Sequence, residues 1–170
     1  NGLLPNEVGY FFISSYLPLK TNLRLQLLLG QFPRFWRSQQ VPVVRPNIRK
    51  RQWQLGGNEF NDDSFEVIAR QFIPLHIPTS YLEGYDQLRK VVDLLPWPKK
   101  PKAIFTSNNY LTDDLFKMWA AEKVETNTPL VIGQHGGHFG MTPFSFGEDH
   151  QIKIATKWLS WGWSDSSRPH

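Results

Sequence analysis

Short apolar runs alternate with amphipathic stretches through the second half of the chain. The runs "KAIFTS" (102–107) and "PLVIGQ" (129–134) are continuous rather than alternating, which is typical of strands buried on both faces. Helices are predicted over 113–125 and 148–156, and "KWLSWGW" (157–163) is predicted as a last strand. This order predicts an α/β domain in which helices cover a mostly parallel sheet.

The first half is less regular. "GYFFIS" (9–14) is a β-prone run, and "TNLRLQLLLG" (21–30) is predicted as a helix capped by one of its first two residues and ended by its glycine. Between 31 and 63, prolines, glycines and basic residues interrupt both the helical and the strand pattern of apolar positions, and one short strand is possible at 41–44. We therefore expect one domain over 1–170 that carries an irregular insertion.

Cap residues mark further helix starts. Ser80 with Glu83 matches a capping box ahead of an apolar stripe over 82–95. Thr112 is expected to cap the helix that follows it, because two acidic residues come directly after it. A further amphipathic helix is predicted from Ser64.

Composition limits the class of protein. The 170 residues include no cysteine, which excludes disulfides and thiolate metal sites and favours the cytoplasm. The net charge is +4, with basic residues clustered at 45–51 and 99–102. Such clusters are either solvated loops or contacts to an anionic surface such as the inner face of a membrane. We expect no nucleic-acid partner.

The segment "VIGQHGGHFG" (131–140) ends an apolar strand in histidines and glycines. Ligands bind beyond the carboxyl ends of parallel strands, so His135 is placed where it could accept a proton from a hydroxyl nucleophile. Gly136 and Gly137 allow positive φ or close approach of a ligand. The competing interpretation is a glycine turn whose histidines bond backbone carbonyls. His138 is a weaker candidate, and Gln134 would shape the floor of the cleft.

Other polar residues at the predicted strand ends could assist. Ser107 and Asn108 could hydrogen-bond a polyol, or they could be ordinary turn residues. Glu148 or Asp149 could cap the following helix, orient His135 or bind a substrate hydroxyl. A zinc site could be built from these carboxylates and the histidines at 135, 138 and 150. It is disfavoured, because the two glycines between His135 and His138 disfavour the helix on which a His-x-x-His pair binds zinc.

Three tryptophans lie near the end of the chain. Trp161 and Trp163 would share one face of a strand and Trp158 the other. In a covered sheet such residues are usually core, whereas exposed ones could stack on sugar rings or bases.

The segments "KAIFTSNNY", "PLVIGQHGGHFG" and "EDHQIKIATKWLSWGW" together resemble a family of transferases from bacterial O-antigen and surface-carbohydrate gene regions. More loosely, they resemble GT-B glycosyltransferases and related polyol-phosphate transferases. The shared pattern is a strand ending in "QHG", then an acidic residue, a helix and a "WG" strand. An Asp of the last part of this pattern is replaced by Thr156.

The resemblance implies a Rossmann-like three-layer domain, as in one half of a GT-B fold. It implies a glycosyltransferase of surface polysaccharide synthesis that acts on a sugar or polyol acceptor. The nucleotide-sugar donor would be held mainly by a C-terminal donor domain outside these residues, so we expect an acceptor-side fragment that is inactive alone and binds no cofactor. The alternative is a non-catalytic module that binds carbohydrate or nucleotide.

Overall fold

The computed structural model describes residues 8–41, 43–56, 65–136, 139–142 and 144–164. Its regular elements, in chain order, are β1 (Val8–Ile13), α1 (Leu19–Leu28), η1 (Ile48–Arg51), α2 (Phe65–His76), η2 (Thr79–Tyr81), α3 (Tyr85–Leu94), β2 (Lys100–Thr106), α4 (Asn109–Thr112), α5 (Asp114–Glu125), β3 (Leu130–Gly133), α6 (Phe146–Ile154) and β4 (Lys157–Leu159).

The chain divides into two compact units. The first comprises Asn1–Gln39 with Leu95–His170 and contains the sheet, and the second comprises Gln40–Leu94. The irregular segment expected at 31–63 thus contributes to both units. The strand expected at 41–44 does not form at its described positions, and the next regular element is the 3₁₀ helix η1.

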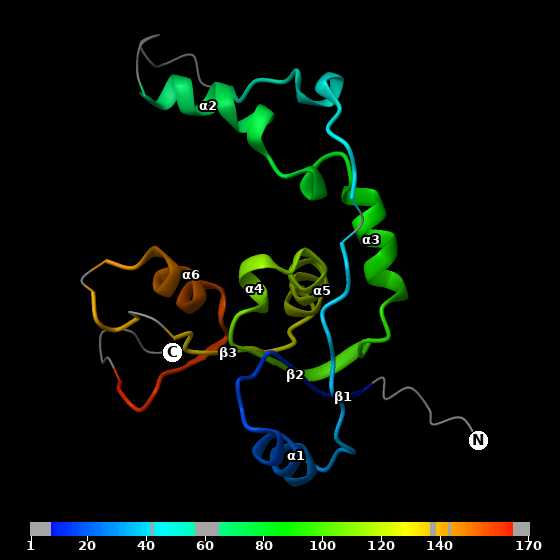
Figure 1. Ribbon diagram of the computed structural model, residues 1–170, viewed down its shortest axis with the longest axis vertical. Coiled ribbons are helices and arrows are strands. Elements are labelled where there is room, and N and C mark those ends of the chain that lie inside the picture. The colour runs from blue at the N-terminus through cyan, green and yellow to red at the C-terminus, as the bar shows by residue number, and fades with distance from the viewer. Residues whose placement is uncertain (1–7, 42, 57–64, 137–138, 143, 165–170) are drawn as a thin grey trace. The chain divides into compact units, whose positions relative to one another are not determined.

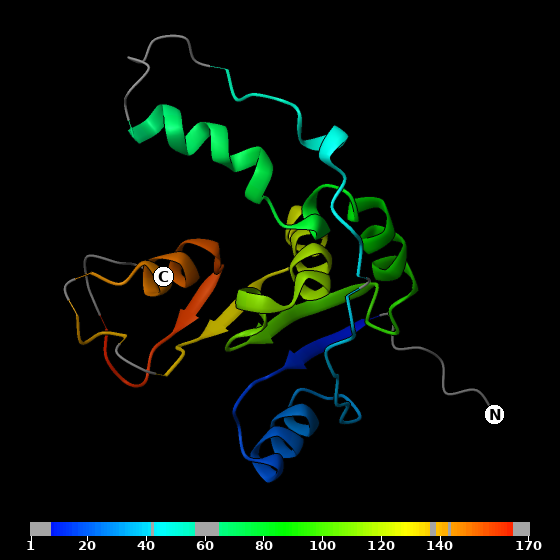
Figure 2. The same ribbon diagram turned by 45° about the horizontal axis from the view of Figure 1, so that its top comes forward.

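The sheet of the first unit has four parallel strands in the order β1-β2-β3-β4 (Figure 1). Phe11 pairs with Ile104, Ile104 with Leu130, and Ile132 with Trp158. α1 lies on one face, while α4, α5 and α6 lie on the other, as Figures 1 and 2 both show. The predicted α/β class, with a parallel sheet between helices in a Rossmann-like arrangement, is confirmed.

Aromatic side chains form much of the core beside β1. The ring of Phe11 is fully buried and lies 4.5 Å from that of Trp119, 5.1 Å from Trp97 and 5.5 Å from Trp36, measured between centroids. Burying rings of this size removes a large apolar area from water, and tilted pairs add a further contribution. The apolar runs at 102–107 and 129–134 are accordingly central strands, with Ile104 and Ile132 fully buried.

The helix caps differ from those expected. α1 begins at Leu19 after Pro18, two residues earlier than predicted, and Asn22 instead donates from its side chain to Ser15 Oγ. Asp113, not Thr112, caps α5 by accepting a hydrogen bond from Phe116 N at 3.0 Å. Asp is as good an N-cap as Thr, so local chemistry alone placed the start one residue early.

The second unit is held by a buried ion pair. Glu83, expected in a capping box with Ser80, lies before α3, which begins at Tyr85. Its carboxylate accepts from Arg51 Nε at 2.7 Å, Arg51 Nη2 at 2.8 Å and Asn47 N at 2.8 Å. Arg51 also donates to three carbonyls at the end of α2, those of Pro74, Leu75 and Ile77. Both bonds of this bidentate pair are charge-assisted, which makes it stronger than a pair of neutral hydrogen bonds.

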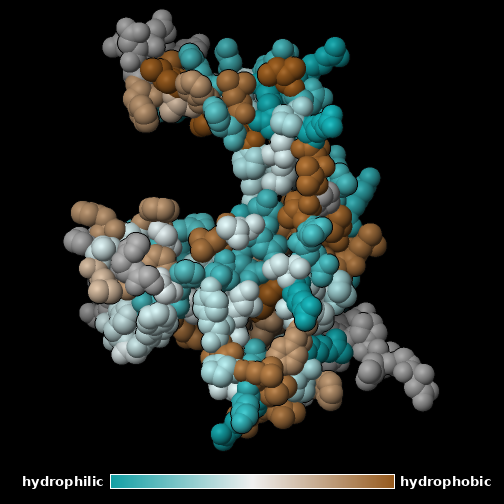
Figure 3. All heavy atoms as spheres, viewed as in Figure 1, coloured by the Kyte–Doolittle hydropathy of each residue, from teal (hydrophilic) through white to brown (hydrophobic). Residues whose placement is uncertain are grey.

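Apolar residues also reach the surface. Leu27 and Leu28 of α1 are exposed, as are Phe65 and Phe72 of α2, and Figure 3 shows brown atoms among teal ones over both helices. Within the described residues, no helix combines the length and the apolar composition needed to cross a bilayer.

Candidate functional site

The carboxyl ends of the four parallel strands meet at one edge of the sheet. The segments that follow them are 14–16, 107–110, 134–136 and 160–163. Ser107 N donates to Ser14 O at 3.1 Å, and Gln134 N donates to Leu159 O at 2.8 Å, so neighbouring segments stay paired just beyond the strands. This edge is where a parallel sheet binds ligands.

His135 leaves the sheet at this edge and is half-buried. Its Nδ1 lies 3.1 Å from Gly136 O. A carbonyl can only accept, so this contact places the proton on Nδ1 and leaves the lone pair on Nε2. A neutral imidazole in this tautomer can take a proton through Nε2. The glycine-turn interpretation is therefore compatible with a basic nitrogen, because among the described residues the backbone contact of the ring is made by Nδ1 and not by Nε2.

Tyr16 links the loop after β1 to His135. The two rings meet edge to face, with centroids 6.0 Å apart, and Asn108 Nδ2 donates to the Tyr16 hydroxyl. Ser14 and Tyr16 have φ of 45° and 56°, in the left-handed region that side chains other than glycine rarely adopt. Such backbone conformations cluster at functional sites, where surrounding contacts hold them in place. Here they turn the chain so that Tyr16 stands beside the imidazole.

The turn after β2 is ordered by its own side chains. Thr106 Oγ1 accepts from Asn108 N at 3.3 Å and from Asn109 N at 3.1 Å. The buried Ser107 hydroxyl donates to Ser15 O at 3.4 Å, so it ties two segments of the edge together. Asn108 is half-buried and reaches Tyr16. The structure thus brings Asn108, Tyr16 and His135 into one cluster and gives Ser107 a bracing position behind them.

Gln134 is buried, and its amide fixes the surrounding loops. Its Oε1 accepts from Trp161 N at 2.9 Å and from Trp163 Nε1 at 3.0 Å, while its Nε2 donates to Phe139 O at 3.2 Å. These three bonds connect the end of β3 to the segment after β4 and to the far side of the glycine-rich loop. Gln134 therefore sets the position of the backbone from which His135 projects.

Behind His135 lies a buried pair that sequence reasoning missed. Gln151 of α6 is fully buried, and its Oε1 accepts from Tyr110 Oη at 3.2 Å and from His135 N at 3.4 Å. Burial raises the pKa of Tyr110 to about 12, with a smaller contribution from Tyr16, so its phenol stays protonated and donates. Within the described part of the chain, Gln151 Nε2 has no hydrogen-bond partner.

The two acidic residues occupy different positions. Glu148 is buried and its Oε2 accepts from Gly140 N at 2.5 Å, which closes the glycine-rich loop. Asp149 is exposed. Neither is the helix cap that was expected, because Ser145 caps α6 by accepting from Glu148 N at 3.3 Å. Glu148 thus supports the loop that carries His135 from its opposite end.

The structure describes only part of the glycine-rich loop. Gly137 and His138 lie outside the described residues. Gly136 does not have a positive φ, and a Cβ built on it would meet the Trp161 ring at 3.6 Å, an ordinary contact. Among the described residues, no three His, Asp or Glu side chains are grouped so that they could hold a metal ion.

The tryptophans do not form the expected two-faced strand. β4 ends at Leu159, so Trp161 and Trp163 belong to a loop. Trp158 and Trp163 pack edge to face with centroids 5.1 Å apart, and Trp161 is 69% exposed. The core interpretation is therefore wrong for Trp161, because the chain leaves the sheet before reaching it, and Trp158 and Trp163 are half-buried.

Tyr16, Tyr110 and Gln151 are the members of this cluster that sequence reasoning did not single out. The position of Tyr16 directly after a strand could have indicated it, as could that of Tyr110 in "TSNNY". Gln151 carries no local signal, because its role depends on where α6 packs. The assembled cluster can bind a hydroxyl-bearing ligand through phenol and amide groups and can remove a proton through His135.

Comparison of the chain with curated proteins and with solved structures gives no match. One family model does match, described as the LIC12162 family transferase, and it covers residues 3–170. The match includes every strand of the sheet and every described residue of the cluster around His135. This chain therefore belongs to the LIC12162 family of transferases.

Proposed function

We propose that this chain is the acceptor-side domain of a GT-B-like glycosyltransferase of surface polysaccharide synthesis. The observation that carries the proposal is the position of His135 at the carboxyl edge of a parallel sheet, beside Tyr16 and Asn108, in a member of a transferase family. The segments "QHGG" and "WGW" resemble those of O-antigen enzymes, and this resemblance is the reason for proposing a sugar as the transferred group.

In the proposed reaction, Nε2 of His135 takes the proton of an acceptor hydroxyl. The oxygen forms a bond to the anomeric carbon of the donor sugar. The bond from that carbon to the nucleotide phosphate breaks, and the phosphate leaves with the electron pair. The Nδ1 contact to Gly136 O supports this role because it leaves Nε2 as the basic nitrogen. The step is redox-neutral, so it needs no oxidant or reductant.

The neighbouring groups are assigned to the acceptor. Tyr16 and Asn108 offer a hydroxyl and an amide to a sugar or polyol, and Gln134 with Glu148 hold the backbone on either side of the loop. The donor is proposed to be a nucleotide-sugar held mainly by a second domain of the GT-B type. Gly137, His138 and Asp149 stay candidates for contacts to either substrate.

The test is replacement of His135 in the full-length natural protein. Release of nucleoside diphosphate is followed over a panel of nucleotide-sugars with sugar and polyol acceptors. Loss of a general base predicts that His135→Ala lowers kcat/KM about 10²–10⁴-fold. His76→Ala is the matched control, because His76 is an exposed histidine of the second unit. Equal rates for His135→Ala and the control would remove the assigned role.

A second function is favoured by the exposure of Trp161. An exposed indole beside Gly136 is suited to stacking on a sugar ring, which would make the chain a binding module without turnover. This alternative predicts that Trp161→Ala abolishes carbohydrate binding while His135→Ala leaves it intact. Turnover of any nucleotide-sugar by the natural protein would decide against it.

A further inference from the structure

The second unit carries an apolar stripe that the proposed function does not use. It lies along α2 and consists of Phe65, Ile68, Phe72 and Leu75, which are 85%, 45%, 51% and 49% exposed. At about 100° per residue these four positions fall within about 80° of one another around the helix axis. A stripe with this spacing normally faces a protein core, whereas here it is open to solvent.

The other sides of α2 are engaged within the unit. Pro74 is buried, and at about 100° per residue it lies opposite Phe65. Glu66 and Arg70 pair with each other at 2.8 Å, away from the stripe. One polar side chain, that of His76, lies along the stripe, and its ring packs on Phe72 with centroids 5.5 Å apart. The helix therefore keeps its ion pair on one side and its apolar stripe on another.

A basic segment is fixed to the end of α2. Arg51 of η1 is buried, and its guanidinium donates to Leu75 O at 2.8 Å, one of the carbonyls at the C-terminal end of that helix. Arg49 and Lys50 directly precede Arg51, Arg45 is six residues ahead of it, and all three are exposed. We call residues 45–50 the basic segment. Its cations are thus held near the end of the stripe to which Leu75 belongs.

We propose that the stripe of α2 and the basic segment together bind the surface of an anionic lipid bilayer. A bilayer interface offers apolar chains and negatively charged phosphate groups within one narrow layer, which matches exposed Phe, Ile and Leu side chains beside exposed Arg and Lys. α2 has 12 residues and is about 18 Å long, so it would lie in the interface and not cross it.

Charge decides the choice of occupant. The exposed cations of the basic segment complement anionic headgroups, which attract Lys and Arg within a Debye length of the surface. A second copy of the chain would instead bring an identical cationic segment to the contact, and like charges at an interface oppose association. An anionic lipid surface therefore satisfies the apolar and the charged residues together.

The two components are of similar strength. Each Lys or Arg close to an anionic surface contributes about fivefold to partitioning, so three contribute about 100-fold at full engagement. Burying the exposed part of one phenylalanine adds roughly tenfold. Removal of either component should therefore produce a loss that a partitioning measurement resolves easily.

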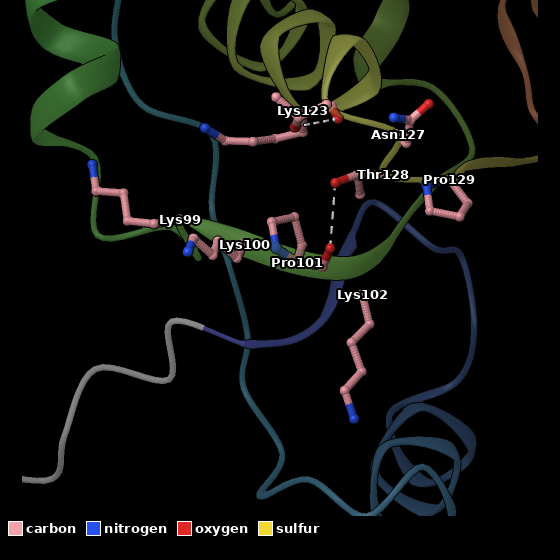
Figure 4. A pocket seen from close by; sticks show the side chains of 9 residues that line it. Lys99, Lys100, Pro101, Lys102, Lys123, Asn127, Thr128 and Pro129 are labelled. Carbon is pink, nitrogen blue, oxygen red and sulfur yellow. Dashed lines mark hydrogen bonds between the residues drawn. The ribbon is translucent and has the colours of Figure 1, made fainter.

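The charge variant replaces the three cations of the basic segment: Arg45→Gln, Arg49→Gln and Lys50→Gln. Its control replaces three exposed lysines of the first unit: Lys100→Gln, Lys102→Gln and Lys153→Gln. Two of these, Lys100 and Lys102, line a hollow of about 490 Å³ at the start of β2 (Figure 4). Both variants lose the same net charge, so non-specific attraction to an anionic surface falls equally.

The stripe variant is Phe65→Ser with Phe72→Ser. Its control is Leu27→Ser with Leu28→Ser, which removes two apolar side chains of α1 that are 61% and 76% exposed. Phe65→Ser alone keeps the test available should Phe72 be needed for folding, because Phe65 is the most exposed member of the stripe.

Flotation with vesicles measures the partitioning. Vesicles of phosphatidylcholine alone are compared with vesicles that also contain phosphatidylglycerol. We expect the wild-type protein to float with the anionic vesicles, and the charge and stripe variants each to partition about tenfold or more weakly. Each control should change partitioning by less than about twofold. Binding should also weaken as salt is raised, because the cations are exposed.

A fluorescent label reports on the stripe directly. The 170 residues contain no cysteine, so Phe72→Cys provides a single position within them for an environment-sensitive dye, and Leu28→Cys is the control. Anionic vesicles should shift the emission of the dye at position 72 to shorter wavelength and leave that at position 28 unchanged. A dye at position 72 that is already shielded without vesicles, and unaffected by them, would show that the stripe is covered within the protein and would overturn the proposal.

The remaining outcomes are also decisive. Failure of the wild-type protein to float with anionic vesicles would overturn the proposal, as would equal losses in the variants and their controls. A dimer seen by sedimentation without lipid, and abolished by the stripe variant, would assign the stripe to a second copy instead. His135→Ala should float like the wild type, so failure here is distinguishable from failure of the proposed transferase activity.

Discussion

Replacement of Gln134 by methionine isolates the hydrogen bonds that hold the loops of the transferase edge. Methionine keeps the length and roughly the volume of the side chain, so the change leaves little cavity behind. It removes the acceptor for Trp161 N and Trp163 Nε1 and the donor for Phe139 O. The backbone bond from Gln134 N to Leu159 O is unaffected.

The expected cost follows from those three bonds. A typical hydrogen bond contributes about 0.5–1.5 kcal/mol net, and a buried group left without a partner costs about 1–3 kcal/mol. Gln134 is buried, but its three partners are in partly buried surroundings where water can replace the amide. We therefore expect about 0.5–1 kcal/mol for each bond, a total of about 1.5–3 kcal/mol.

Urea unfolding followed by far-UV circular dichroism measures the free energy of unfolding. Trp163→Phe is the partner variant, because it removes one of the three bonds while keeping an aromatic ring. The double variant should cost less than the sum of the two single changes, because the bond to Trp163 Nε1 can be lost only once. A cost below about 0.5 kcal/mol for Gln134→Met would refute the assignment of Gln134 as the tether of these loops.

Three further variants test other parts of the structure. Hydrogen bonds from Arg51 and from Asn47 N hold the pKa of Glu83 at about 2, below its ordinary 4.5. Its contribution to stability is therefore present above about pH 4.5 and lost as the pH falls toward 2, and Glu83→Gln should flatten that acid limb in melting temperatures recorded against pH. Burial raises the pKa of Tyr110 to about 12, above the ordinary 10, so its contribution is lost between pH 10 and 12. An ultraviolet titration of the tyrosines should lose the step at the highest pH in Tyr110→Phe. Loss of a step at lower pH instead would contradict the burial argument. Asp113→Ala should cost about 1 kcal/mol in urea unfolding, because Phe116 N loses its cap, whereas Thr112→Ala should cost little.

The placement of His135 at an open edge could be reasoned from sequence. Continuous apolar runs around Ile104 and Ile132 indicated buried parallel strands, and residues that follow such strands share one edge. Asn108 was identified by the same argument.

Sequence reasoning did not bring the partners of His135 together. Tyr16, Tyr110 and Gln151 come from the loop after β1, from α4 and from α6, and only the packing of these segments places them at one site. Glu83 shows the same limit. Its local pattern indicated a capping box with Ser80, but nothing local indicated its bidentate pair with a guanidinium 32 residues away.

The sequence by itself determined the class of fold, the positions of the buried strands along the chain and the edge of the sheet at which the "QHGG" segment emerges. These depend on periodicity and on backbone geometry, which are local properties of the chain. Tertiary structure alone decided that Gln134 faces inward to bind two tryptophans, that Trp161 is exposed, and that the apolar stripe of α2 stays open to solvent. Such pairings depend on how elements distant in sequence pack, and no single segment records them.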